Sequence, residues 1–326
     1  MKPVTVGKYR ALQRASTPDG HFTILALDHS DALKRVMNPA SPQTVTTEQM
    51  IAFKRQVVAA LAPEASGILL DPIYGAAQAI SGGYLGSAGL LVELEKADYQ
   101  LEPMPLGVEI LPGWSVARIK RMGAEGVKLF FYYNADAPEL AGKQDTLLRQ
   151  VVADCADHDI PLYAEPILYP IGETDSVYVE QYTRRQIESA RRIDALGADV
   201  LKLEFPVPAA RLADESLCRD ACAQVSAAVD APWVLLSAGV SFDAFCRQVE
   251  IACAAGASGY IVGRAVWGEA ALIADEGERQ RWLDTVGRER MQRLAACAQS
   301  GTPWTSRIAC EPVSTDWYRG YREAEA

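Results

Sequence analysis

Eight short apolar runs, separated by longer stretches of helical periodicity, constrain the fold of this 326-residue chain more than any other feature. The runs are rich in Val, Ile, Leu and aromatic residues, which is typical of buried parallel strands. They are Phe22–Leu27, Gly67–Leu70, Leu106–Ile110, Val127–Tyr133, Leu162–Ala164, Val200–Phe205, Trp233–Leu236 and Gly259–Val262.

The segments between the runs carry apolar residues at helical spacing, most clearly in Thr47–Leu61, Thr183–Leu196 and Ser241–Ala254. Glycines recur shortly before strands, and we interpret them as helix C-caps that lead into the next strand. These glycines are Gly123, Gly126, Gly197 and Gly256.

Strands that alternate with helices, without a long linker, favour a single α/β domain that folds as a (β/α)₈ TIM barrel. An open doubly wound sheet is the alternative, but no G-x-G-x-x-G follows the first strand. We predict one domain over residues 1–326, with the barrel at about 20–270 and a C-terminal helical extension at about 271–326. The segment from Pro303 to Ala326 is expected to be an irregular tail.

The charge and the apolar pattern limit the partners of the chain. Lys plus Arg number 32 and Asp plus Glu 42, so the net charge of −10 opposes binding to nucleic acid and to anionic membranes. No run approaches the roughly 18 apolar residues of a membrane span, and the first residues lack a signal-peptide core. Seven cysteines without a C-x-x-C motif indicate reduced thiols. We expect a cytoplasmic protein with a small-molecule substrate, and leave homo-oligomer formation open.

Lys202 is the most informative charged residue, because barrel enzymes carry their active sites at the carboxyl ends of the strands. Strand alternation places Lys202 and Glu204 on one face of the Val200–Phe205 strand and two leucines on the other. If the leucines face the helices, Lys202 faces the interior. Burial lowers the pKa of an ammonium group, and the free amine is the nucleophile that forms a Schiff base with a ketone. An ion pair with Glu204 and no chemistry is the alternative.

Lys128 and Glu165 lie on neighbouring strands. Lys128 is two strands before Lys202, and alternate strands contribute to one interior layer of a barrel. Two ammonium groups that face one cavity repel, which lowers the pKa of one of them further. Glu165 ends the strand between them, and its carboxyl group can carry protons to and from a substrate. A salt bridge from Glu165 to either lysine is compatible with that role.

The last two strands end in a pattern that predicts a phosphate site. Backbone N–H groups of glycine-containing loops, together with an arginine, commonly bind phosphate at this place in a barrel. The residues are Ser237, Gly239, Gly263 and Arg264. A surface arginine at a helix start is the alternative for Arg264.

Metal chemistry is disfavoured by the three histidines of the chain. His21 and His158 precede strands and belong at the opposite end of the barrel, so His29 is alone near the site and a three-histidine zinc centre cannot form. An oxygen-only Mg²⁺ site at Asp28 and Asp71 stays open, although the two basic residues oppose it. We therefore expect neither a metal nor an organic cofactor.

Seven motifs, in the same order and spread from about residue 9 to residue 306, resemble the class I tagatose-1,6-bisphosphate aldolases. They are Asp28-His-Ser-Asp-Ala-Leu-Lys34, Leu70-Asp-Pro-Ile-Tyr-Gly75, Ala88-Gly-Leu-Leu91, Gly126-Val-Lys-Leu-Phe-Phe-Tyr-Tyr133, Asp199-Val-Leu-Lys-Leu-Glu-Phe-Pro206, Leu236-Ser-Ala-Gly-Val-Ser241 and Gly263-Arg-Ala-Val-Trp267.

The resemblance implies a metal-free Schiff-base aldolase on a TIM barrel. Lys202 would form the imine, Glu165 would move protons, and Lys128 and Asp28 would line the cavity. Ser237, Gly239, Gly263 and Arg264 would hold a substrate phosphate. The reaction would cleave D-tagatose 1,6-bisphosphate to dihydroxyacetone phosphate and glyceraldehyde 3-phosphate.

One motif departs from the family pattern. Relatives usually read Asp-Gln-Arg-Gly after the first strand, where this chain has His29 and Ser30 at the Gln and Arg positions. These two residues would bind the distal group of the substrate. Because the cation of the family pattern is absent, that group need not be a phosphate. The related 6-deoxy-6-sulfofructose-1-phosphate aldolases are therefore an alternative. A barrel isomerase that uses Glu165 and Asp28 as base and acid, and a non-catalytic phosphosugar sensor, are two others.

Overall fold

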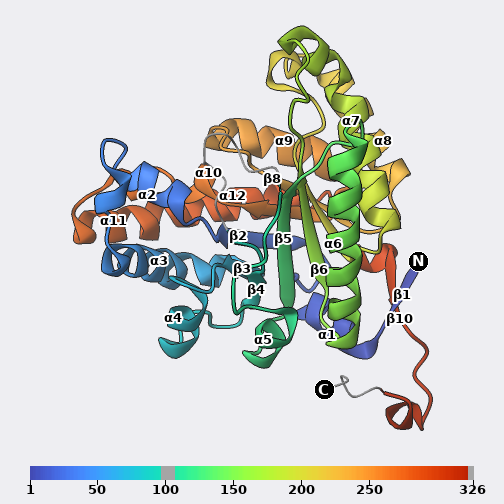
Figure 1. Ribbon diagram of the computed structural model, residues 1–326. Helices are drawn as coiled ribbons and strands as arrows, with labels where there is room; N and C mark the ends of the chain where they lie inside the picture. Colours follow the sequence, from blue (N-terminus) through green and yellow to red (C-terminus); the bar gives the residue numbers. More distant parts are fainter. Residues whose placement is uncertain (97–106, 322–326) are drawn as a thin grey trace.

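The chain folds around a closed barrel of eight parallel strands that follow one another in chain order. Figure 1 shows the helices arranged around these strands. The computed structural model describes residues 1–96 and 107–321. The barrel strands are β2 (Phe22–Leu27), β3 (Gly67–Leu70), β4 (Gly89–Glu93), β5 (Gly126–Tyr132), β6 (Leu162–Ile167), β7 (Val200–Leu203), β8 (Trp233–Leu236) and β9 (Gly259–Val262). The closed parallel barrel confirms the predicted (β/α)₈ fold and excludes the open sheet.

The third barrel strand was predicted in the wrong place. It is β4, whereas Leu106 of the expected strand lies outside the described residues and Ile110 forms only an isolated antiparallel bridge with Glu95. Glu109 of the same segment is exposed. The β4 run ends in acidic residues that interrupt its apolar pattern, and for this reason the periodicity pointed to the next apolar segment instead.

Helices surround the barrel, and two of the three predicted helices match their expected bounds closely, whereas the helix predicted at Thr183–Leu196 begins earlier, at Asp175. The helix α3 spans the predicted residues and begins with a capping box of Thr46 and Gln49. The helices are α1 (Val6–Arg14), α2 (Asp31–Met37), α3 (Thr47–Leu61), α4 (Ala76–Ser81), α5 (Val116–Arg121), α6 (Pro138–Asp157), α7 (Asp175–Ala195), α8 (Glu215–Ala228), α9 (Phe242–Ala254), α10 (Arg264–Trp267), α11 (Glu276–Trp282) and α12 (Arg288–Ala298).

Three of the four predicted glycine caps have the left-handed backbone that such a cap requires. Gly123, Gly197 and Gly256 have φ values of 91°, 105° and 111°. Gly126 is different, because it begins β5, where a Cβ atom would lie 2.7 Å from the ring of Tyr163. The small residue at this position is therefore needed for packing rather than for a turn.

Side-chain alternation divides the apolar residues into an inner and an outer core. Leu201 and Leu203 belong to the outer core between strands and helices, while Val200 belongs to the inner core at the amino end of the barrel. Lys202 is two residues from Val200 and hence faces the barrel interior, as predicted. Trp304 and the helix α1 also contribute to this inner core, at the amino end of the barrel.

The chain termini form a second, small sheet. Strand β1 (Lys2–Val4) pairs in parallel with β10 (Ile308–Cys310), which lies in the segment expected to be an irregular tail. Before β10, a π-helical turn at Leu283–Gly287 joins α11 to α12, and α12 packs against α9. All seven cysteines are free, and within the described ranges no helix is both long and apolar enough to cross a bilayer.

Candidate active site

A cavity of about 280 Å³ opens at the carboxyl ends of the barrel strands. Most of the residues singled out in the sequence line it. The predicted residues in its wall are Asp28, His29, Lys128, Glu165, Lys202, Ser237, Gly239, Gly263 and Arg264. Ser30 is not among the lining residues and instead precedes the first residue of α2.

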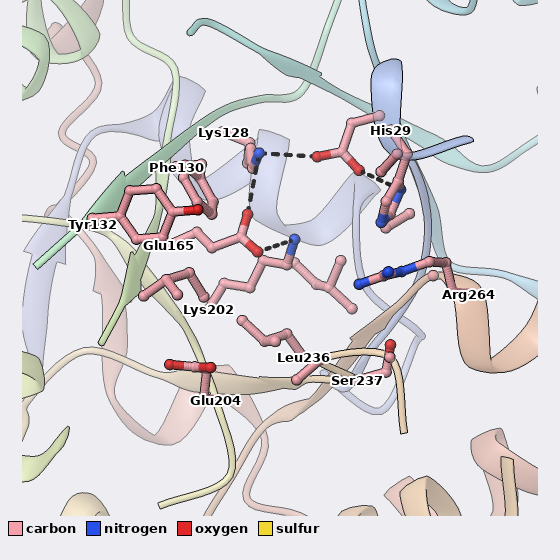
Figure 2. A pocket seen from close by; sticks show the side chains of 18 residues that line it. His29, Lys128, Phe130, Tyr132, Glu165, Lys202, Glu204, Leu236, Ser237 and Arg264 are labelled. Atoms are coloured by element: carbon pink, nitrogen blue, oxygen red, sulfur yellow. Dashed lines mark ion pairs between the residues drawn. The ribbon is translucent and has the colours of Figure 1, made fainter. Parts of the chain in front are cut away.

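Glu165 lies between the two lysines, as Figure 2 shows. Its Oε1 atom is 2.9 Å from Nζ of Lys202, and its Oε2 atom is 3.1 Å from Nζ of Lys128. All three side chains are buried or nearly so, with exposed fractions of 9% or less. Lys202 therefore pairs with Glu165, whereas the alternative considered from the sequence was a pair with Glu204.

Lys128 is surrounded by carboxylates. Besides Glu165, its Nζ atom lies 2.9 Å from Oδ2 of Asp28 and 2.5 Å from Oε1 of Glu95. The ammonium group of Lys128, on β5, is thus contacted by carboxylates from three places: the loop after β2, the segment after β4, and β6. Because Lys128 is 1% exposed and has three acidic neighbours, it is placed to fix the positions of Asp28 and Glu165 rather than to react itself.

The electrostatics of this cluster hold Asp28 in its ionised form. Burial alone would raise the pKa of the Asp28 carboxyl, but the nearby positive charges of Lys128 and Lys202 outweigh burial and move the pKa well below its ordinary value. Glu93 shows the opposite result. Burial, reinforced by the negative charge of Glu95, raises the pKa of Glu93 well above its ordinary value.

Glu93 and Glu95 were missed as site residues in the sequence analysis. Leu91 lies in the inner core, and the alternation Leu91-Val-Glu-Leu-Glu95 directs both carboxyl groups inward from β4 and its end. Acidic residues at every second position of an apolar run were the available signal. The signal was overlooked because the third strand had been placed at Leu106–Ile110.

The loop after β8 forms one end of the cavity together with Arg264. Ala238 and Gly239 have φ values of 44° and 78°, and the N–H of Val240 donates to the carbonyl of Ser237 over 3.0 Å. A Cβ atom on Gly239 would lie 3.2 Å from the Nη2 atom of Arg264, so a side chain there would crowd the guanidinium. The left-handed backbone at Ala238, unusual for a residue with a side chain, is a strain of the kind that often occurs at binding sites.

His29 lies at the same end of the cavity as Arg264. Its ring packs edge-on against Trp267 with the centroids 5.2 Å apart, and its Nδ1 atom is 3.4 Å from Oδ1 of Asp28. A Cβ atom on Gly263 would approach Cε1 of His29 to 2.8 Å, so the glycine makes room for the ring. Burial, aided by the positive charge of Arg264 against the opposing effect of Asp28, lowers the pKa of His29 to about 3. The imidazole is therefore neutral near pH 7.

The opposite end of the cavity is formed by Phe130, Tyr132, Ile167 and Glu204. Figure 2 shows Tyr132 and Glu204 on one side of Lys202 and Arg264 on the other. Burial raises the pKa of Glu204 to about 7, although hydrogen bonds from Leu168 and Gln186 act in the opposite direction. From the sequence, Glu204 was considered only as a partner for Lys202.

The two aspartates considered for Mg²⁺ are each paired with a lysine. Asp71 contacts Lys54 and accepts hydrogen bonds from the N–H groups of Ile73 and Tyr74, while Asp28 contacts Lys128. Within residues 1–96 and 107–321, no group of three or more His, Cys, Asp or Glu side chains is arranged to hold a metal ion. Asp28 and Asp71 are thus committed to protein contacts.

The chain belongs to the DeoC/LacD aldolase family, whose model matches residues 22–269. Among curated proteins, it is 31% identical to the tagatose 1,6-diphosphate aldolase 2 of Enterococcus faecalis, over 94% of this chain and 98% of the relative. It is also 31% identical to the tagatose 1,6-diphosphate aldolase of Lactococcus lactis, over 94% and 99%.

Solved structures support the same fold at lower sequence identity. An archaeal fructose-1,6-bisphosphate aldolase, with its catalytic lysine bound to the carbinolamine intermediate, has a TM-score of 0.60 and 19% identity, over 89% of this chain and 99% of the other. Fructose-bisphosphate aldolase from Plasmodium falciparum has a TM-score of 0.67 and 13% identity, over 92% and 97%. At these identities the likeness shows the fold alone.

Proposed function

We propose that this protein is a class I aldolase that cleaves a ketose phosphate through an imine on Lys202. The observation that carries the proposal is the position of Glu165, within 2.9 Å of Nζ of Lys202 and 3.1 Å of Nζ of Lys128, at the wall of a cavity that ends at Arg264. A nucleophile, a proton carrier and a group that holds the carrier in place are thus adjacent.

The reaction begins when the neutral amine of Lys202 attacks the C2 carbonyl carbon of the ketose, and loss of water from the carbinolamine gives the iminium ion. Glu165 is near enough to take the proton of the lysine and to return a proton to the leaving hydroxyl. Glu165 then takes the proton of the C4 hydroxyl, and the C3–C4 bond breaks to release the aldehyde. The bonding electrons enter the iminium to form an enamine, which is protonated at C3 and hydrolysed to release the second product.

The phosphate on C1 would bind to Ser237, Gly239, Gly263 and Arg264. This end of the cavity supplies a guanidinium and a tight loop, which suit phosphate oxygens. The binding of a distal group by His29 and Ser30 stays a prediction. The position of His29 beside Gly263 and Arg264 makes it equally suited to the C1 phosphate.

The substrate we propose first is D-tagatose 1,6-bisphosphate, cleaved to dihydroxyacetone phosphate and glyceraldehyde 3-phosphate without a metal or organic cofactor. The names of the curated relatives support this choice. A panel in a coupled cleavage assay should compare it with fructose 1,6-bisphosphate and with 6-deoxy-6-sulfofructose 1-phosphate, the alternative raised by His29 and Ser30.

The decisive test is reduction with borohydride in the presence of dihydroxyacetone phosphate, followed by peptide mass spectrometry. The proposal requires the adduct on Lys202. An adduct on another lysine, or turnover without any adduct, contradicts it. The second outcome would favour an isomerase, while ligand binding without carbon–carbon cleavage would indicate a phosphosugar sensor.

A further inference from the structure

Glu204 is a carboxyl group in the cavity wall for which the proposed imine chemistry has no use. It follows β7 directly and is two residues beyond Lys202, so its side chain lies nearer the mouth of the barrel. In Figure 2 it lies on the side of Lys202 away from Arg264. Glu204 is partly buried, and a carboxyl group with little access to water is costly unless it is paired or used, so this position calls for an explanation.

One oxygen of Glu204 is committed to the protein. The Oε2 atom accepts a hydrogen bond from the N–H of Leu168 over 3.0 Å and another from Nε2 of Gln186 over 2.8 Å. The same Gln186 nitrogen donates to the hydroxyl of Tyr182 over 3.1 Å. These contacts tie the carboxyl group to the end of β6 and to α7. In the described part of the chain no such contact is found for Oε1.

The surroundings of Glu204 are matched to a hydroxyl group rather than to an anion or a cation. In residues 1–96 and 107–321 no lysine or arginine forms an ion pair with it, and the charge of Glu165 opposes its ionisation. Because burial raises its pKa to about 7, both the acid and the carboxylate are present near neutral pH. Such a group can accept a hydrogen bond from a hydroxyl or donate one to it, whereas its ionised form repels phosphate.

We propose that Glu204 is a specificity-determining residue, whose Oε1 atom forms a hydrogen bond with a hydroxyl group on the aldehyde half of the substrate. The inference rests on the proposed function. With the C1 phosphate at Arg264 and C2 bonded to Lys202, the remaining carbons extend along the wall formed by Phe130, Tyr132 and Glu204. A terminal phosphate, where the substrate has one, must lie beyond Glu204.

The test uses the condensation direction, with saturating dihydroxyacetone phosphate and two three-carbon acceptors. D-Glyceraldehyde carries hydroxyl groups, and propionaldehyde carries none. In the wild type kcat/KM is expected to be higher for glyceraldehyde. In Glu204→Leu the glyceraldehyde value is expected to fall at least about tenfold and the propionaldehyde value less than about threefold, because a site built to bind a hydroxyl discriminates by that hydrogen bond.

Two further variants separate recognition from structure. The amide oxygen of Glu204→Gln can still accept from Leu168 and Gln186, so this variant keeps the loop contacts and changes only the group that faces the cavity. We expect the preference for glyceraldehyde to fall about threefold or more. Gln186→Met breaks the contact on the α7 side alone, and it is expected to change both acceptors by the same factor.

Equal losses for both acceptors in Glu204→Leu, or a change of acceptor preference in Gln186→Met as large as that in Glu204→Leu, would overturn the inference. Borohydride trapping on the wild type keeps this failure distinct from failure of the proposed function. If the wild-type protein neither forms the borohydride adduct nor catalyses the condensation, the aldolase proposal is wrong. If the wild-type protein forms the adduct and catalyses the condensation, but the acceptor preference does not depend on residue 204, only the assignment of Glu204 is wrong.

Discussion

Each end of the barrel buries a lysine beside a carboxylate, but only the pair at the carboxyl end lines the active-site cavity. At the amino end, Nζ of Lys8 lies 2.8 Å from Oδ2 of Asp199, and the same oxygen accepts a hydrogen bond from the N–H of Leu162 over 2.9 Å. At the carboxyl end, Lys202 lies 2.9 Å from Glu165 in the wall of the 280 Å³ cavity. The N–O distances of the two ion pairs are alike, so distance and burial do not distinguish a structural ion pair from a catalytic one.

The difference lies in what surrounds the shared carboxylate. Asp199 is shared by Lys8 and, at 3.7 Å, by Lys2, and this contact fixes the first helix against the start of β7. Glu165 is also shared by two lysines, but all three groups line the cavity, and one of them, Lys128, is held by two further carboxylates. A shared carboxylate can give up its contact with one ammonium and keep the other, which is what a proton carrier beside a reacting amine requires.

The largest effect is expected from Lys202→Ala. Loss of the nucleophile should lower kcat for ketose phosphate cleavage by at least about 10⁴-fold and abolish the borohydride adduct, because Lys128, the other lysine of the cavity wall, is held by three carboxylates. Activity is measured in a coupled assay, and circular dichroism verifies the fold. Cleavage within a hundredfold of the wild type would contradict the role of Lys202.

The matching change at the other end is Lys8→Met, which should affect stability and not chemistry. Removing one partner of a buried pair leaves an uncompensated charge and costs about 3–5 kcal/mol; we expect about 3 kcal/mol because Lys2 remains near Asp199. Urea denaturation measures the loss. The kcat per folded molecule should stay within about twofold. A selective loss of kcat without loss of stability would remove the distinction between the two ends.

The fold and most of the site could be predicted because both depend on short-range patterns. Side chains alternate along β7, so Lys202 must face the barrel interior if Leu201 and Leu203 pack against the helices. The ends of parallel strands meet at one edge, so Glu165 and Arg264 could be assigned to the same cavity before any coordinates were available.

The contacts that could not be predicted depend on the choice of partner in three dimensions. The glutamate that pairs with Lys202 is Glu165, not the Glu204 of its own strand, because a neighbouring strand brings its carboxyl group nearer. The pairing of β1 with β10 joins the two chain ends, and two three-residue strands give almost no periodic signal. Glu95 was missed because its strand was misplaced.

A smaller effect is expected from Arg264→Ala. A hydrogen bond to a charged group contributes about 1.5–3 kcal/mol, so KM for a ketose 1-phosphate should rise about tenfold to a hundredfold while kcat changes only a few fold. Arg293→Ala is the matched control, since Arg293 is an exposed arginine on α12 that pairs with Asp243 at 3.1 Å. Equal KM values in the two variants would show that Arg264 does not hold the phosphate.

The smallest expected effect is on stability and concerns Glu204, which, unlike Asp199, has no lysine partner in the described residues. Its pKa is raised from 4.5 to about 7 by burial, so the folded state binds the proton more tightly than the unfolded state. The free energy of unfolding must therefore fall as the pH rises from about 4.5 to about 7 and then level off, with a loss of about 2.5 kcal/mol between pH 5 and pH 8. Glu204→Gln cannot ionise, so between pH 5 and pH 8 its free energy of unfolding, measured by urea denaturation, should rise by this amount relative to the wild type.

The control is Glu139→Gln, because the side chain of Glu139 is 90% exposed, and this variant should show no such gain. A gain of the same size in both variants would mean that the burial of Glu204 is not its cause.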